Sequence, residues 1–321
     1  MTEFYPLINN SRRRSSAHHS FISTKTVANV LSTIKQHPYR PLIDLPVRAT
    51  IEETLDLLLA EDIISVPVYR CDNNKKHYIT IVSALDLLKW LSNHTDLETL
   101  QSTRDIMLSP LSEAIGMTDE SSRLVTIRPT DSLESVIALL SNNSHRVLVQ
   151  GENTPVLLSQ MDIVKYLHSH NHQLGAAILD LTVPTIVEKA LARRHHDQSV
   201  ISINFKTTAL DAFVEMAHRQ IGALPIVDDT DTLVADISPK DLRGLNRNRF
   251  DTLAKPVIIY LKTSHGELCP PFTCHERFTL SQIMAAFVLR KAQRIWWCNQ
   301  DGRLNGVITL SDFLGTFIDE I

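Results

Sequence analysis

The chain has 321 residues, 43% of them hydrophobic, and a formal net charge of −4 from 32 Lys and Arg against 36 Asp and Glu. The hydrophobic content is sufficient for packed cores, whereas the charge gives no general attraction to nucleic acid or anionic lipid. The chain has four cysteines, too few for a disulfide framework, and no apolar signal segment or stretch long enough to span a membrane, so we expect a cytoplasmic or nuclear protein.

Residues 1–24 are polar and lack an apolar period, so we expect a disordered tail. Within it, arginines precede Ser15 and Ser16 in a pattern that suits a basophilic kinase, and an added phosphate would reverse the local charge. A second polar tract, residues 193–198, predicts a linker that divides the rest of the chain into two halves.

One unit recurs four times along the remaining chain. In each copy, a helix-start signal is followed sixteen residues later by the centre of a short apolar strand, for example from position 50 to position 66. The four pairs are Thr50 and Val66, Asp131 and Val147, Thr208 and Leu224, and Thr279 and Ile295. Each strand leads through a polar turn into a second strand, which predicts a hairpin. We expect repeats of a βαββα unit over residues 25–100, 115–172, 185–248 and 254–321.

Capping signals predict both helices of each unit. Thr50 and Glu53 form a capping box, and equivalent signals follow at Asp131/Glu134, Thr208/Asp211 and Thr279/Gln282. A second signal of the form Ser/Thr-x-x-Asp closes each unit after its hairpin. These closing pairs are Ser83 and Asp86, Ser159 and Asp162, Ser238 and Asp241, and Thr309 and Asp312.

Together, residues 40–321 resemble four copies of the CBS domain, a module that pairs into Bateman units. Residues 222–228 with 238–242, and residues 306–313, are especially close to the family pattern. Four copies with almost no other domain resemble the γ regulatory subunit of the AMP-activated kinase family, and related CBS-only regulators of fungi and plants. The resemblance implies an α+β fold in which the four repeats pair into two Bateman modules that form a disc-like pseudo-dimer.

In the γ family, the closing aspartate binds the two ribose hydroxyls of an adenine nucleotide. The resemblance assigns this role to Asp86, Asp162, Asp241 and Asp312, whose carboxylates could accept charge-assisted hydrogen bonds. A structural alternative explains the same residues, because Asp in this motif also caps a helix near the positive end of its dipole.

Phosphate binding in a cleft requires positive charge or several backbone donors. His145 and Arg146 match the family's His-Arg pair and should face Asp86, but the fourth unit has Gln293 before Arg294, and Ile64 stands where the family often has an arginine. We expect an adenine slot near Asp312. The candidates for adenine and phosphate contacts are Ser83, His145, Arg146, Thr207, Gly222, Ala223, Ser238, Lys240, Arg294, Thr309 and Ser311. Salt-bridged arginines and close packing of small residues are the alternative explanations.

Other motifs point to no further chemistry. Cys269, Cys274 and His275 lack the second ligand pair of a zinc site, so we expect no metal. The sequence contains no phosphate-binding loop, nucleophile elbow or metalloprotease motif, so we expect no enzyme activity and no cofactor. Trp296 and Trp297 alternate across a strand, which places one of them in the core.

We therefore expect a non-catalytic regulator that senses AMP, ADP or ATP and acts on a protein kinase through its α and β subunits. The alternative is a CBS scaffold or inhibitor that acts on a type 2A-like protein phosphatase without nucleotide. The missing cations at Ile64 and Gln293 favour this alternative. The sequence leaves open the choice among AMP, ADP, ATP and S-adenosyl ligands.

Overall fold

A computed structural model describes residues 16–35, 40–98, 104–142, 144–151, 154–194 and 200–319. Most of the expected tail lies outside these residues, but its last part is a helix, α1 (Ala17–Ser23). This corrects the expectation of disorder up to residue 24. The physical reason is apolar burial, because Phe21 and Ile22 enter the core with exposed fractions of 5% and 0%.

The first two repeats have the same order of strands and helices. The elements of repeat 1 are α2 (Val27–Ile34), β1 (Leu45–Pro46), α3 (Ile51–Ala60), β2 (Ser65–Asp72), β3 (Lys75–Ser83) and α4 (Ala84–His94). The elements of repeat 2 are η1 (Arg104–Leu108), η2 (Leu111–Ala114), α6 (Asp119–Ser122), β4 (Thr126–Ile127), α7 (Leu133–Asn142), β5 (Arg146–Val149), β6 (Val156–Ser159) and α8 (Gln160–Ser169). Two short elements, η3 (Asn171–Gln173) and α9 (Ala176–Leu179), then lead to the third repeat.

The last two repeats follow the same plan, except that repeat 3 closes on a 3-10 helix. The elements of repeat 3 are α10 (Val183–Arg194), β7 (Ile203–Asn204), α11 (Ala209–Arg219), β8 (Leu224–Val227), β9 (Leu233–Ile237) and η4 (Pro239–Leu242). The elements of repeat 4 are η5 (Arg247–Ala254), α12 (Val257–His265), β10 (Thr273–Cys274), α13 (Leu280–Arg290), β11 (Arg294–Cys298), β12 (Leu304–Thr309) and α14 (Leu310–Thr316). No described helix is long and apolar enough to cross a membrane.

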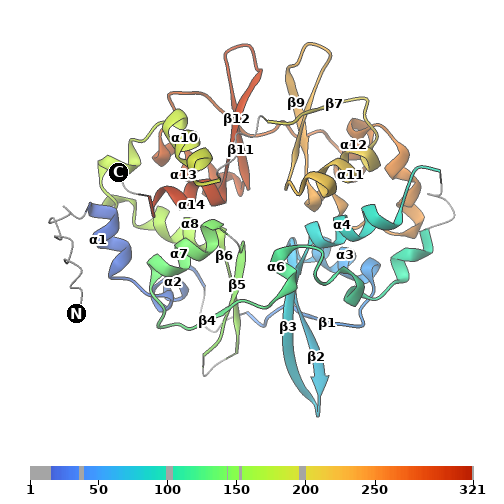
Figure 1. Ribbon diagram of the computed structural model, residues 1–321, viewed down its shortest axis with the longest axis horizontal. Helices are drawn as coiled ribbons and strands as arrows, with labels where there is room; N and C mark the ends of the chain where they lie inside the picture. The colour runs from blue at the N-terminus through green and yellow to red at the C-terminus, as the bar shows by residue number, and fades with distance from the viewer. Residues whose placement is uncertain are drawn as a thin grey trace, which may run out of the picture.

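Each repeat forms its own three-stranded sheet. In repeat 1 the order is β1-β2-β3, with β1 parallel to β2 and β2 antiparallel to β3, and the other three sheets repeat this pattern. The parallel pair requires the crossover helix between its strands. The expected βαββ order is therefore confirmed in all four copies, and the closing α-helix in repeats 1, 2 and 4, whereas repeat 3 closes on the 3-10 helix η4. The β2–β3 hairpin extends well beyond the body of the molecule (Figure 1).

The capping signals locate three of the four crossover helices. At α3, the Glu53 amide donates to the Thr50 hydroxyl at 3.1 Å and the Thr50 amide donates to the Glu53 carboxylate at 2.8 Å. The expectation for the second repeat was wrong by one residue. The Asp131 carboxylate accepts from the Arg128 amide in the preceding turn, and Ser132 takes over as acceptor for the first turn of α7.

The segment that precedes each repeat's first strand packs on the other repeat of the same module. We call these the leader segments, and they comprise residues 26–35, 104–122, 182–194 and 247–265. Each makes an isolated β-bridge to the start of the partner's crossover helix. The bridges are Thr26 to Ser132, Pro110 to Thr50, Thr182 to Thr279, and Pro256 to Thr208. This exchange of leaders joins repeat 1 to repeat 2 and repeat 3 to repeat 4.

The hydrophobic cores run across the two modules. One core joins α1 and α2 to repeats 2 and 4, and the other joins repeats 1 and 3. They form the two sides of the flat molecule in Figure 1, with the sheets directed toward the centre. The expected linker needs a related correction, because α10 continues through residues 193–194, and residues 195–199 lie outside the described residues. Each half of the chain thus contributes to both cores.

Candidate functional site: a central cavity shared by four repeats

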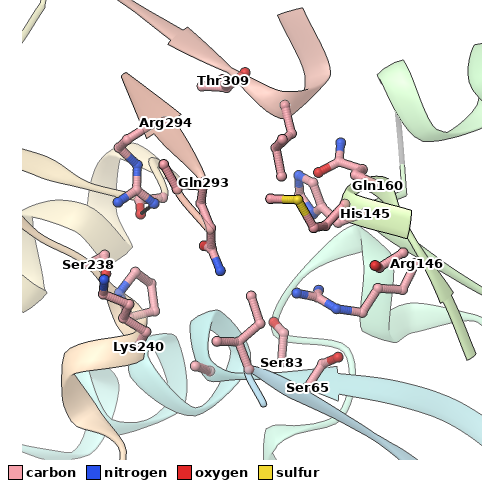
Figure 2. Close-up of a pocket in the computed structure, with 18 of the residues that line it drawn as sticks. Ser65, Ser83, His145, Arg146, Gln160, Ser238, Lys240, Gln293, Arg294 and Thr309 are labelled. Carbon is pink, nitrogen blue, oxygen red and sulfur yellow. Dashed lines mark hydrogen bonds between the residues drawn. The ribbon is translucent and has the colours of Figure 1, made fainter. Parts of the chain in front are cut away.

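A cavity of about 1660 Å³ lies at the centre, where all four repeats meet. In Figure 2, Arg146 and Arg294 enter from opposite walls, and Gln293 projects between them. Most of the sequence-predicted site residues line it, and they are Ser83, His145, Arg146, Asp162, Gly222, Ala223, Ser238, Lys240, Arg294, Thr309, Ser311 and Asp312. Asp86, Thr207 and Asp241, all of them described, do not line it.

The cavity wall is positively charged, although the chain as a whole is acidic. Ten Lys and Arg line it against five Asp and Glu, which is a formal excess of five positive charges where the chain carries −4. The ten are Lys35, Arg40, Arg146, Lys165, Arg193, Lys240, Arg243, Arg290, Lys291 and Arg294. Arg40 and Arg193 pair with Glu61 and Asp319, which lie outside the lining, so the net positive charge of the wall comes from the other cations. A concave surface with a net positive charge favours anions.

The four closing aspartates all cap helices, as the structural alternative predicted. In each, Oδ2 accepts from the amide and the hydroxyl of the Ser or Thr three residues earlier. At Asp312, for example, the Thr309 amide donates at 2.9 Å and the Thr309 hydroxyl at 2.7 Å. The cap therefore fixes one oxygen of each carboxylate, and at Asp86, Asp162 and Asp241 the second oxygen has a partner from another segment.

At Asp86 the second oxygen accepts from two hydroxyls of the neighbouring leader. Thr118 Oγ1 donates at 2.7 Å and Ser121 Oγ at 2.5 Å. Asp86 itself has an exposed fraction of 0%. Asp86 thus makes four hydrogen bonds in a buried position, and it does not line the cavity that His145 and Arg146 line.

A lysine ammonium and a histidine ring each contact the second carboxylate oxygen of another closing aspartate. The Lys35 ammonium donates to Asp162 Oδ1 at 2.9 Å, and His265 Nε2 lies 2.8 Å from Asp241 Oδ1. Burial alone would raise the pKa of Asp241, but the His265 hydrogen bond and the Lys240 charge outweigh it and hold that pKa below its ordinary value. Asp241 is therefore a buried carboxylate that has a hydrogen-bond partner, His265, beyond its own helix cap.

The Asp312 side of the cavity keeps most of its expected lining. Gly222 faces open space, since a Cβ added there would meet nothing within 4 Å. The Gln160 amide donates to the Ser311 hydroxyl at 2.8 Å, which links repeat 2 to repeat 4 across the wall. Thr207 is the exception. Its carbonyl accepts from the Val257 amide at 2.7 Å, so it belongs to the leader contact and not to the cavity wall.

His145 and Arg146 are held by one carboxylate that the sequence did not single out. Glu120 accepts from the His145 and Arg146 amides at 3.0 Å and from His145 Nδ1 at 2.9 Å. Burial would raise the pKa of Glu120, but the His145 hydrogen bond and the Arg146 charge outweigh it and lower that pKa. The closest Arg146–Glu120 ion-pair distance is 3.9 Å.

On the opposite wall, Arg294 is partly committed to neighbouring groups. Its guanidinium donates to the Gly222 carbonyl at 2.8 Å and lies 3.4 Å from Asp236. Trp296 is buried and donates to the same Asp236 at 3.3 Å, whereas Trp297 packs half-buried against a core, so the expected alternation is present. Lys240 is exposed to the cavity.

The cysteines considered as metal ligands differ in environment. Cys269 is exposed and lines the cavity, whereas Cys274 is buried. Burial and the neighbouring Cys298 raise the pKa of the Cys274 thiol to about 12. Thiolates are the metal-binding form, so Cys274 is a poor ligand at neutral pH.

Sequence reasoning missed the donors that meet the aspartates. They are Lys35, Thr118, Ser121 and His265, and each lies in a leader segment. Lys35 is 127 residues from Asp162, so no local spacing connects them. The available signal was the order of the elements, because each leader ends beside the closing aspartate of its partner repeat.

Comparison with known proteins agrees with this architecture. Residues 192–246 match the CBS domain model. The chain is 23% identical to the SNF1-related protein kinase regulatory subunit gamma-like PV42b of Arabidopsis thaliana, over 86% of this chain and 90% of the relative. It is 24% identical to the 5'-AMP-activated protein kinase subunit gamma of Saccharomyces cerevisiae, over 92% and 90%. The crystal structure of MJ1225 from Methanocaldococcus jannaschii, suggested to be an archaeal homolog of g-AMPK, superposes with a TM-score of 0.66 at 17% identity, covering 89% of this chain and 98% of that one.

Proposed function

We propose that this chain, a tandem CBS-domain protein that resembles AMP-activated protein kinase γ subunits, is a non-catalytic regulatory subunit that senses adenine nucleotides. The central cavity carries the proposal. Its excess of five positive charges suits a phosphate-bearing ligand, and its wall includes residues from all four repeats. An anion bound there contacts both modules at once.

The proposed mechanism is a shift in the arrangement of the two modules. A ligand changes such an equilibrium only by its difference in affinity for the two arrangements. Arg146 lies in the first module and Arg294 in the second, so a bound anion favours the arrangement that brings these cations together. A kinase bound to the outer surface would then be held differently with and without nucleotide.

Calorimetry and thermal denaturation of the full chain with AMP, ADP and ATP test nucleotide sensing. We expect binding and a stabilisation of about 2.7 kcal/mol when the nucleotide is at 100 times its Kd. No heat and no thermal shift at millimolar concentrations of all three nucleotides would contradict the proposal. The small molecule released when the purified protein is denatured provides an independent check.

The proposed partners are the α and β subunits of a protein kinase, as the names of the relatives suggest. The complex would work in the cytoplasm or nucleus. Affinity capture of the full chain should recover a kinase catalytic subunit, and the activity of that complex should respond to AMP. A complex whose activity ignores nucleotide would leave only the scaffold part of this proposal.

A second candidate function is a scaffold or inhibitor of a type 2A-like phosphatase that works without nucleotide. The observation that favours it is that internal donors already engage Asp86, Asp162 and Asp241. Capture of a phosphatase subunit by nucleotide-free protein, unchanged by added AMP or ATP, would support this candidate over the first.

A further inference from the structure

Each leader segment ends against the closing aspartate of its partner repeat. Lys35 reaches Asp162, Thr118 and Ser121 reach Asp86, and His265 reaches Asp241. The fourth leader follows the same path, since the Arg193 guanidinium donates to the backbone carbonyl of Asp312 at 3.0 Å. The contact recurs because each leader segment crosses to its partner repeat. Its C-terminal end then lies beside the closing aspartate of that repeat.

These donors occupy the carboxylate oxygens that ribose hydroxyls would need as acceptors. A ribose at Asp162 must displace an ammonium at 2.9 Å, and one at Asp86 must displace two hydroxyls inside a fully buried site. Replacing a charge-assisted bond by a ribose hydroxyl gains little, because the carboxylate is already satisfied. The exchange costs additional free energy wherever the displaced donor is left without a partner.

The cavity provides a different set of free groups. Among the described residues, the side chains of Lys165, Lys240, Arg290 and Lys291 have no hydrogen-bond or ion-pair partner, and all four line the cavity. They come from repeats 2, 3 and 4. The remaining six cations of the wall have carboxylate or carbonyl partners, so these four are the wall's cations without a partner within hydrogen-bond or ion-pair distance.

We infer that the cavity recognises its ligand by a chain of phosphate groups, and that ribose hydroxyls contribute almost nothing at Asp86, Asp162 and Asp241. This deepens the proposed function and rests on it for the adenine part of the ligand. The preferred ligand class is a polyphosphate with three or more negative charges, so ADP and ATP should bind more tightly than AMP, which carries a single phosphate. At these three aspartates, donors from the leader segments make the hydrogen bonds to the carboxylate that ribose hydroxyls would otherwise make.

Two matched ligand pairs test the inference on the full chain at low salt. The first pair is ATP and 2′,3′-dideoxyATP, which lacks both ribose hydroxyls. We expect their Kd values to agree within about threefold, whereas loss of hydrogen bonds to a charged carboxylate would separate them by about tenfold or more. Because the inference does not cover Asp312, the same pair is measured on an Asp312→Asn variant, and a tenfold separation that persists there would overturn the inference while the proposed function stands.

The second pair is inorganic tripolyphosphate and adenosine. Tripolyphosphate should displace ATP and adenosine should not, and raising the salt concentration should weaken tripolyphosphate binding because exposed charges are screened. Displacement by adenosine alone would overturn the inference. If tripolyphosphate binds but no nucleotide does, the nucleotide function fails and the phosphate site stands. If neither binds, both fail.

A set of alanine variants locates the phosphate. Lys165→Ala and Lys240→Ala each remove a cation of the wall that makes no hydrogen bond, and should raise the Kd for tripolyphosphate by about threefold or more at low salt. Lys262→Ala is the control, since Lys262 is exposed on α12 and does not line the cavity. Equal Kd values in all three variants and the unaltered chain would place the anion outside the cavity and overturn the assignment.

Discussion

Lys35, at the end of the first leader segment, forms an ion pair with Asp162 of the second repeat, with the ammonium 2.9 Å from the carboxylate. The side chains are exposed by 29% and 10%, so the pair lies at the inner margin of the cavity and is only partly screened by water. This contact keeps the closing aspartate from solvent and joins a segment before repeat 1 to repeat 2.

The first prediction follows from this pair. Lys35→Ala frees the second oxygen of Asp162, so a ribose can bind there and the variant should prefer ATP to 2′,3′-dideoxyATP. The ratio of the two Kd values is the measurement, because the lost positive charge affects both nucleotides equally. Binding of both nucleotides with the equal affinities of the unaltered chain would show that Lys35 does not stand in a ribose position.

The same variant should be less stable. We expect Lys35→Ala to lower the free energy of unfolding by about 1 kcal/mol, since Asp162 keeps its cap and the lost ion pair is partly exposed. Denaturant titration measures this, and Lys75→Ala at the exposed tip of the β2–β3 hairpin is the control.

The second prediction concerns Asp86. Asp86→Ala removes the acceptor for a helix cap and for two leader hydroxyls, and it should lower the free energy of unfolding by about 3 kcal/mol. Glu53→Ala is the matched control, because it removes an exposed capping carboxylate and should cost about 1 kcal/mol or less. Equal losses in the two variants would contradict the structural role of the buried contacts at Asp86.

The repeat plan could be predicted from the sequence because it depends on local patterns. Spacings such as Thr50 to Val66 reflect a helix and a strand that are continuous in the chain, and the closing boxes bring their partners within three residues. The one error among the crossover helices, at Asp131, arose because two adjacent residues could both cap α7 and the carboxylate was used by the Arg128 turn.

The contacts between repeats could not be predicted in the same way. Apolar faces such as that of α4 do not encode which other apolar face will cover them, so the pairing of repeat 1 with repeat 3 in one core was not visible. The leader donors had the same difficulty, since Lys35 and His265 look like ordinary exposed residues until the exchange of leaders is known. The site was therefore predicted as separate residues, most of which line one cavity, but without the groups that contact the aspartates.

The third prediction is a loss of stability in mild acid. His18 is fully buried in α1, and burial together with the neighbouring His19 lowers its pKa from 6.5 to about 4. A base with a lowered pKa in the folded state binds fewer protons than in the unfolded state, so stability falls as the pH falls from about 6.5 toward 4. The unfolding midpoint of the unaltered chain should decrease over this range.

A His18→Gln variant separates His18 from the other groups that titrate. Its unfolding midpoint should fall less steeply between pH 6.5 and pH 5 than that of the unaltered chain, because glutamine does not bind a proton. Parallel curves for the two proteins would show that the acid sensitivity comes from elsewhere.

The fourth prediction separates the adenine base from the phosphates at Gly222. A side chain there projects into open space, so Gly222→Val should leave the free energy of unfolding unchanged within about 0.5 kcal/mol. The same valine fills part of the cavity next to Arg294, whose guanidinium contacts the Gly222 carbonyl.

If the base lies in this slot, overpacking should raise the Kd for ATP roughly fivefold or more, at a cost of about 1–3 kcal/mol, and leave the Kd for tripolyphosphate unchanged. Gly222→Ala, which adds a single methyl group, should give a smaller change in the same direction. An unchanged ATP affinity in a folded Gly222→Val protein would place the base elsewhere in the cavity, and an equal loss for ATP and tripolyphosphate would mean that the valine disturbs the cations and not an adenine slot.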